Sequence, residues 1–332
     1  QFPGHALRTP RAGRVPPMNA LKVRLLLFTV AILALFSISW LLSKNLLGSI
    51  SVMHAVGLRL WATTAALWLI VAFGTRPPLA SKPLLARMPG FFILSILGFS
   101  LYFVCSFGAL KTLKASDLTM VLATIPGITY LLGLLTRSLG FSWLKLAGVV
   151  IVSVAALAFN THTGDVSAVS PSGIALALVA ALSYAVYGLL SKRYLKDLPL
   201  INSLAWVTLI AAACFVPLFI LDPAPLLRLN LEDALKVLIL GAACSAPVYV
   251  LYQKVLAEGG VLYANAIGLL APFAVVTGEW LIGSGTTLGA VKIVAMIAVM
   301  VGITLLFMDA SGASGWTFKR RAPNQPVSEE IQ

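Results

Sequence analysis

Residues 25–43 have the sequence LLLFTVAILALFSISWLLS, which contains no Asp, Glu, Lys or Arg. A membrane-spanning helix needs about 20 consecutive, mostly apolar residues, so this segment predicts a transmembrane helix. Similar segments recur along the chain, and the second of them is preceded by the polar residues His54 and Arg59. The ten predicted spans are Leu25–Ser43, Leu60–Thr75, Met88–Leu110, Leu118–Thr136, Leu146–Thr161, Val166–Ser191, Leu198–Leu221, Val237–Gln253, Gly259–Gly278 and Ile293–Met308.

The composition places the whole chain in a membrane. Of the 332 residues, 59% are apolar and 11% are charged, and the mean hydropathy is +0.96. A soluble protein could not hide so much apolar surface from water, whereas lipid leaves no need to hide it. The predicted fold class is therefore an all-α integral membrane protein with ten transmembrane helices.

The net charge of +13 is interpreted as a topology signal. Of the Lys and Arg residues outside the spans, 17 lie on the side of the N-terminus and six on the other side. Under the positive-inside rule, this imbalance places both termini in the cytoplasm, with the chain in an inner (plasma) membrane. The expected partners are the lipid bilayer and a small-molecule substrate, with no nucleic acid, and we expect a monomer.

The chain carries no pattern typical of metal or enzyme chemistry. Its three cysteines, Cys105, Cys214 and Cys244, lie inside apolar segments without a metal-binding spacing. No catalytic cluster, phosphate-binding Gly loop or ATP-binding segment is visible. We therefore expect no metal, no cofactor and no catalytic residue, and a protein that is not an enzyme.

Polar tails flank the apolar part of the chain. Residues 1–21 form a basic tail, and residues 1–17 are either an addition upstream of Met18 or the remnant of a basic organellar presequence. Residues 309–332 are polar, and we expect a disordered cytoplasmic tail there. Both tails are set aside in the functional interpretation.

An internal repeat divides the apolar part into two halves. The sequence LLSK occurs at 41–44 and again at 189–192, 148 residues later. Pro126 and Pro272 are separated by 146 residues, and Gly148 and Ala295 by 147. Residues 22–161 and 166–308 are therefore predicted to be equivalent five-helix units. Because five is odd, the second unit enters the membrane from the opposite side, which makes an inverted repeat.

Short motifs in both halves support a family resemblance. They are GLRL at 57–60, FGAL at 107–110, KAS at 114–116, Pro126, and LAP at 270–272. In this order and spacing the chain, over residues 22–308, resembles the EamA group of the drug/metabolite transporter superfamily. The resemblance implies a transporter with ten helices in two inverted five-helix repeats.

The second half departs from the family pattern. The group often carries a Gly-Glu pair about thirteen residues after the second proline, where this chain has SGT at 284–286; its nearest such pair is Gly278-Glu279. The YddG-type exporters of aromatic amino acids resemble this chain in lacking the pair, although Ile125 stands where they have an aromatic residue. The resemblance therefore implies an amino acid exporter, with a multidrug or other metabolite carrier as the alternative.

Pro126 and Pro272 are predicted to kink their helices. A proline inside a helix removes one backbone hydrogen bond and frees a carbonyl about one turn earlier. In lipid such a carbonyl is costly unless it faces protein or water. The kinks therefore predict two helices that face a central cavity, with a packing kink that binds no ligand as the alternative.

Two charges are predicted to lie inside the membrane, Arg59 and Glu279. An intramembrane charge indicates a functional site by default. Three interpretations stay open: a structural ion pair between the two residues, a proton-coupling role for Glu279, and substrate binding by Arg59.

Aromatic residues occupy equivalent positions in the two halves. Phe36 and Tyr184 are 148 residues apart, and Tyr102 and Tyr249 are 147 apart. Together with Arg59 they are the candidates for lining the cavity, because rings and phenol hydroxyls suit an amphipathic or aromatic substrate. Helix packing or an interfacial aromatic belt would use the same residues.

These observations predict a secondary transporter that moves a small amphipathic metabolite by alternating access through a central cavity. A passive channel and a membrane-embedded enzyme or scaffold are the alternatives of another class. Substrate identity, direction of transport and the form of energy coupling do not follow from the residues.

Overall fold

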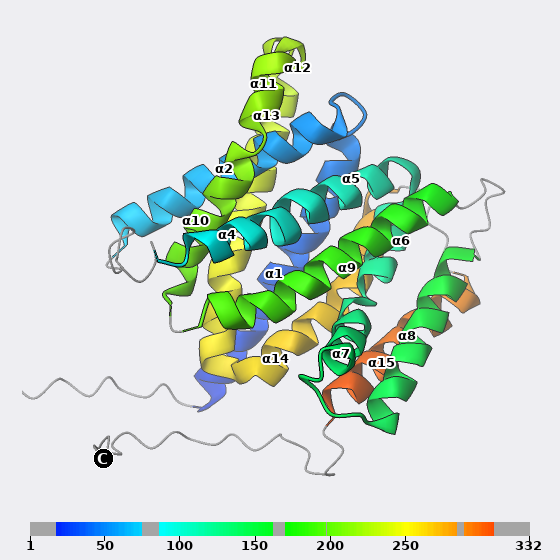
Figure 1. Cartoon of the computed structure of the whole chain (residues 1–332). Helices are drawn as coiled ribbons and strands as arrows, with labels where there is room; N and C mark the ends of the chain where they lie inside the picture. Colours follow the sequence, from blue (N-terminus) through cyan, green and yellow to red (C-terminus); the bar gives the residue numbers. More distant parts are fainter. Residues whose placement is uncertain (1–17, 75–85, 162–169, 197, 284–288, 309–332) are drawn as a thin grey trace, which may run out of the picture.

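The computed structural model describes residues 18–74, 86–161, 170–196, 198–283 and 289–308, and all regular elements within them are helices. The first half consists of α1 (Met18–Leu46), α2 (Val52–Phe73), α4 (Met88–Ser95), η1 (Ile96–Leu101), α5 (Tyr102–Thr112), α6 (Ala115–Leu122), α7 (Ile125–Leu135) and α8 (Trp143–Thr161). The second half consists of α9 (Pro171–Tyr194), α10 (Leu200–Ala213), α11 (Val216–Leu221), α12 (Ala224–Leu227), α13 (Leu231–Leu238), η2 (Ile239–Ser245), α14 (Ala246–Leu281) and α15 (Ala290–Phe307). The predicted all-α fold is confirmed (Figure 1). The predicted tails, apart from residues 18–21, and the segment 284–286 lie outside the described residues.

Nine stretches of described residues are long and apolar enough to cross a membrane. Several consist of consecutive elements, such as α4, η1 and α5, which together make the stretch Met88–Thr112. The predicted ninth span corresponds to a shorter apolar segment, Leu270–Leu281, which is the last part of α14. The ten predicted spans thus each have a counterpart among the described helices, and the ninth is shorter than expected.

The last part of α14 runs parallel to α1. Near the start of α1, Arg24 Nε donates a hydrogen bond to Glu258 Oε2 at 2.9 Å. Further along both segments, Ser37 Oγ donates to the carbonyl oxygen of Ala274, also at 2.9 Å. Since the residue numbers rise together in the two segments, both cross the bundle in the same direction.

The first part of α14 runs in the opposite direction. Ser245, just before α14, shares the guanidinium of Arg59 with Ser39 of α1. Ten residues later, Val255 packs with Ile32, which lies earlier in α1. The chain therefore turns back within α14, as its colours show in Figure 1. The two arms of α14 take the places of the predicted eighth and ninth helices.

The two halves pack most closely through their last helices, α8 and α15, which lie side by side in Figure 1. A Cβ atom on Gly302 would lie only 2.9 Å from the carbonyl oxygen of Gly148. Small residues allow membrane helices to approach this closely, because no side chain separates the backbones. The landmark glycine of the first half is therefore a contact point between the halves.

The ends of the bundle are named here after α1, which begins at the inner end and finishes at the outer end. Lys44, near the end of α1, donates to the carbonyl oxygen of Leu113 after α5 at 2.9 Å, so α5 ends at the outer end. A Cβ on Gly173, at the start of α9, would lie 2.9 Å from Leu113. Near the other end of α9, the carbonyl oxygen of Arg193 accepts from Arg87 at 3.1 Å. Helix α9 thus runs from the outer to the inner end.

Candidate functional site

The third membrane crossing of each half contains a π-helical turn, η1 in the first half and η2 in the second. Each turn contains a glycine that lets another helix approach. A Cβ on Gly98 would collide with the ring of Tyr187 in α9, and one on Gly241 would lie 2.8 Å from the carbonyl oxygen of Arg59 in α2. The turns lie close before Tyr102 and Tyr249 in the chain. π-Helical turns often occur at functional sites, and the sequence pattern did not predict these two.

Arg59 lies two turns into α2 and is only 6% exposed. Its Nη2 donates to Ser39 Oγ at 2.9 Å and to Ser245 Oγ at 3.1 Å, and its Nη1 donates to Ser43 Oγ at 3.4 Å. The guanidinium also lies over the ring of Phe103, 4.4 Å from its centre. One side chain thus connects α1, α2, α5 and the end of η2.

The hydrogen-bond partners of Arg59 are hydroxyls, and no described carboxylate contacts it. Its Nε atom is buried and has no hydrogen-bond partner among the described residues. The phenol groups of Tyr249 and Tyr102 are its main electrostatic neighbours. The predicted ion pair with Glu279 is therefore not formed, because hydroxyls and rings surround the guanidinium instead.

Six aromatic residues beside Arg59 form a continuous group, which we call the ring cluster. Its members are Phe99 from η1, Tyr102 and Phe103 from α5, Tyr184 and Tyr187 from α9, and Tyr249 from α14. The centroid distances are 5.0 Å for Tyr102–Phe103, 4.8 Å for Tyr102–Tyr184, 5.2 Å for Tyr184–Tyr187, 5.9 Å for Phe99–Tyr187 and 6.1 Å for Phe99–Tyr249. Both halves of the chain thus contribute rings to one site in the middle of the bundle.

The ring cluster only partly matches the candidates predicted from symmetry. Tyr102, Tyr184 and Tyr249 belong to it, whereas Phe36 makes its ring contact with Trp40 of α1 at 5.9 Å. Three members were missed, namely Phe99, Phe103 and Tyr187. The positions 147 residues after Phe99 and Phe103 are Ala246 and Val250, so the search for symmetric pairs passed over them.

One face of α9 is less closely packed in its inner part than in its outer part. Ala177, Ala180, Tyr184 and Gly188 share one face of this helix because they are three or four residues apart. The two alanines are fully buried, yet Tyr184 is 38% exposed, and no described residue lies within 4 Å of where a Cβ on Gly188 would be. Since α9 runs toward the inner end, packing on this face becomes looser in that direction.

Four charged side chains lie together near the outer end, and we call them the outer charge cluster: Lys44, Asp117, Glu279 and Lys292. Glu279 Oε1 accepts a hydrogen bond from the backbone N–H of Ser116 in α6 at 3.0 Å. Asp117 interacts electrostatically with Lys292 and Glu279, and Lys44 with both acids. Asp117, Glu279 and Lys292 are each no more than 5% exposed.

The outer charge cluster corrects two sequence interpretations. Asp117 and Lys292 stand just outside the predicted spans, next to Leu118 and Ile293, but both are buried inside helices, in α6 and α15. Glu279 lies near the outer end as predicted, but its environment is this cluster rather than Arg59. The cluster brings opposite charges of the first and second halves near one another at the outer end.

The two prolines behave differently. Pro272 lies inside α14, as predicted. Pro126 does not kink a continuous helix, because α6 ends at Leu122 and Pro126 stands in the first turn of α7. A proline is favoured there, since the first turn of a helix has no intrahelical use for its missing N–H. The prediction of a kink at Pro126 is wrong in form, although the helix is interrupted at that place.

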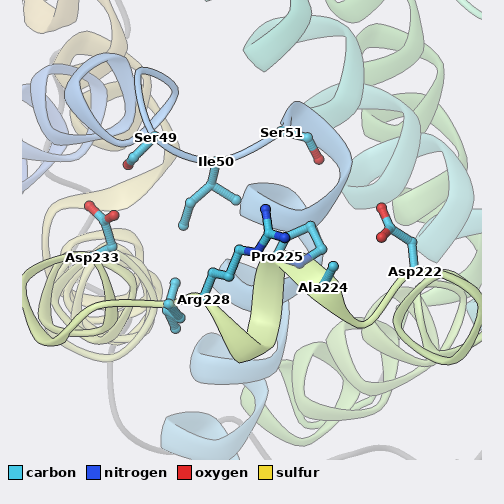
Figure 2. A pocket seen from close by; sticks show the side chains of 9 residues that line it. Ser49, Ile50, Ser51, Asp222, Ala224, Pro225, Arg228 and Asp233 are labelled. Atoms are coloured by element: carbon cyan, nitrogen blue, oxygen red, sulfur yellow. The ribbon is translucent and has the colours of Figure 1, made fainter.

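A small cavity of about 250 Å³ lies at the outer end, apart from the ring cluster. Figure 2 shows it between the loop after α1 and the segment around α12. Its lining residues are Ser49, Ile50, Ser51, Asp222, Ala224, Pro225, Arg228, Leu229 and Asp233. Typical ligand pockets begin at about 300 Å³, and this one shares no residue with the Arg59 site.

Comparisons with known proteins agree with this architecture. Residues 23–161 and 171–308 each match the EamA-like transporter family. One curated relative, "Uncharacterized transporter YdfC" of Bacillus subtilis (strain 168), is 29% identical over 138 residues, which is 41% of this chain and 45% of the relative. A chain described as "Crystal structure of protein" superposes with a TM-score of 0.58 at 18% identity, over 85% of this chain and 96% of that chain. This last likeness concerns the fold alone.

Proposed function

The chain belongs to the EamA-like transporter family, and from this premise we propose that it is a secondary carrier that exports amino acids or similar small amphipathic metabolites by alternating access. The proposal rests on one observation, the site at which Arg59 and the ring cluster meet. Residues of both halves form this site, in the middle of the bundle. Carriers built from inverted repeats bind their substrates at such a place, because rocking one repeat against the other then exposes the site to each side in turn.

The closed outer end and the open inner end fit one state of that cycle. Charged side chains are buried at the outer end. Toward the inner end, Tyr184 is partly exposed and Gly188 is loosely packed. We assign the inner end to the cytoplasm, because 17 of the Lys and Arg residues lie on that side against six on the other. In this assignment a substrate enters the site from the cytoplasm of a cell with the carrier in its inner membrane.

Glu279 is the proposed coupling residue for protons. It lies at a contact between the halves, where loss of its charge would weaken its attraction to neighbouring Lys44. Glu279→Gln should then abolish accumulation driven by a pH gradient while sparing exchange of substrate for substrate. Unchanged pH-driven accumulation in this variant would refute the coupling role and leave the carrier function intact.

Flux into liposomes tests the carrier function. The purified protein is reconstituted, and uptake of a labelled aromatic amino acid is measured against protein-free liposomes. A carrier predicts uptake that saturates with concentration and is accelerated by unlabelled substrate inside the vesicles. Uptake that rises linearly, without this acceleration, would favour a channel. Transport of lipophilic cations with no response to amino acids would favour a multidrug carrier.

A further inference from the structure

Among the described residues, none places an opposite charge in contact with Arg59 in the central site. Arg59 is buried, with 6% of the residue exposed. Two of the three serines that accept from it have their own hydroxyl protons engaged elsewhere: Ser43 donates to Ser39 O at 2.6 Å, and Ser245 donates to Leu240 O at 2.8 Å. These hydroxyls offer lone pairs to the guanidinium but no negative charge.

A buried charge without a counterion is costly, and membrane proteins keep one only where it has a task. Two N–H groups of Arg59 remain available, because Nε–H has no acceptor among the described residues and Nη1 uses one of its two hydrogens on Ser43. The ring of Phe103 covers one face of the guanidinium at 4.4 Å and compensates only part of the charge. A ligand that brings an anionic oxygen to Nε would complete this environment.

We propose that Arg59 binds the carboxylate of the transported substrate and that the ring cluster holds its aromatic or apolar body. The inference rests on the proposed carrier function and specifies its substrate class as amphipathic monocarboxylates. One guanidinium with two open N–H groups suits a single carboxylate, which has two oxygens, better than a phosphate, which brings three acceptor oxygens and a larger charge.

The described residues of the site include no acidic partner for an ammonium group. The nearest electrostatic neighbours of Arg59 are phenols and the thiol of Cys244, and the acids Asp117 and Glu279 belong to the outer charge cluster. The carboxylate is therefore the recognised group. The α-ammonium of an amino acid is tolerated against ring faces rather than required.

Three probes with the same phenyl ring separate these contributions. Phenylalanine carries both charged groups, phenylpyruvate carries only the carboxylate, and phenethylamine carries only the ammonium. Each is tested for protection against thermal unfolding of the purified protein and for competition with phenylalanine flux. A ligand that binds the folded state raises its melting temperature. We expect both carboxylates to protect and compete, and the amine to do neither. Protection by the amine equal to that by the two acids would overturn the proposal.

Variants at Arg59 provide the second measurement. Arg59→Met should lose protection by both carboxylates, whereas Lys111→Met, which removes an exposed cation at the outer end, should keep it. Arg59→Lys should retain weakened protection, because it keeps the charge and loses the planar guanidinium. Carboxylate protection unchanged in Arg59→Met would overturn the assignment and leave the carrier function standing. If Arg59→Met does not fold, the proposal is tested with Arg59→Lys and with the three probes on the unmodified protein. Absence of flux with every probe and with other metabolites would instead contradict the proposed function.

Discussion

The Arg59 site and the outer charge cluster both bury cations in a membrane protein, yet they neutralise them differently. Lys292 is 4% exposed and interacts with the carboxylate of Asp117, which also interacts with Glu279. Arg59 is 6% exposed, and its neighbours are serine hydroxyls, phenols and a phenyl ring. In the outer charge cluster, described carboxylates lie near the lysines. At the Arg59 site, no described carboxylate contacts the guanidinium.

This difference separates stability from function. Removing one member of a buried, mutually compensated charge group leaves the other uncompensated, which is strongly destabilising. Removing a charge that the protein does not compensate relieves a desolvation cost instead. We therefore expect the outer charge cluster to hold the halves together and Arg59 to serve the substrate, with opposite consequences when each is mutated.

The largest effect is expected from Arg59→Met on transport. A hydrogen bond to a charged group contributes about 1.5–3 kcal/mol, so the apparent affinity for a carboxylate substrate should fall by about 10- to 100-fold. The melting temperature without ligand should stay the same or rise, because the variant no longer buries a charge. Liposome flux and thermal unfolding measure the two quantities. A clear fall in unliganded stability with unchanged affinity would mean that Arg59 stabilises the fold and does not bind the substrate.

Lys292→Met should show the opposite behaviour. The substitution leaves Asp117 buried without its main cationic neighbour, and we expect a loss of about 3 kcal/mol in stability. Unfolding of the purified protein by denaturant measures it, and Lys111→Met, at an exposed position, is the matched control. Equal stability of the two variants would show that the outer charge cluster does not hold the halves together.

The double variant Asp117→Asn/Lys292→Met sharpens this test. Because it removes both charges, it should be more stable than the sum of the two single losses predicts, by about 1–3 kcal/mol. Denaturant unfolding of the unmodified protein, the two single variants and the double variant gives the interaction energy between the two side chains. Strict additivity would mean that the two side chains do not interact across the halves.

The smallest effect is expected at the glycines beside the ring cluster. In Gly98→Ala, the added methyl would displace the Tyr187 ring from its edge contact with Phe99, at a cost of about 1 kcal/mol. Gly188→Ala is the control, because its methyl would enter open space and alanine favours a helix. Carboxylate protection should weaken in the first variant only. Similar weakening in both would argue that the position of Tyr187 does not matter for binding.

Particular residues show how far the sequence could predict the site. Arg59, Tyr102, Tyr184 and Tyr249 were found from an intramembrane charge and from positions repeated after about 147 residues. Tyr187 was missed although it lies one turn after Tyr184 and although Trp40 precedes it by 147 residues.

Asp117 and Lys292 were missed because of where they stand in the sequence. Both lie at the ends of apolar segments, where a loop residue and the first turn of a buried helix look the same in sequence. Pro126 was misjudged similarly, because a proline between two short helices and a proline within one long helix have the same apolar surroundings. Only packing distinguishes these cases.

The sequence by itself determined that this protein lies in a membrane, that it consists of two inverted halves, and that Arg59 and Glu279 lie within it. These properties follow from segment length, hydropathy and loop charge, which act locally along the chain. The tertiary structure decided which groups surround each buried charge. The neighbours of Arg59 come from residues 39, 43, 103 and 245, and their meeting depends on helix rotation, on two π-helical turns and on the return of the chain within α14. Such long-range placement is set by packing between helices, which a local pattern cannot specify.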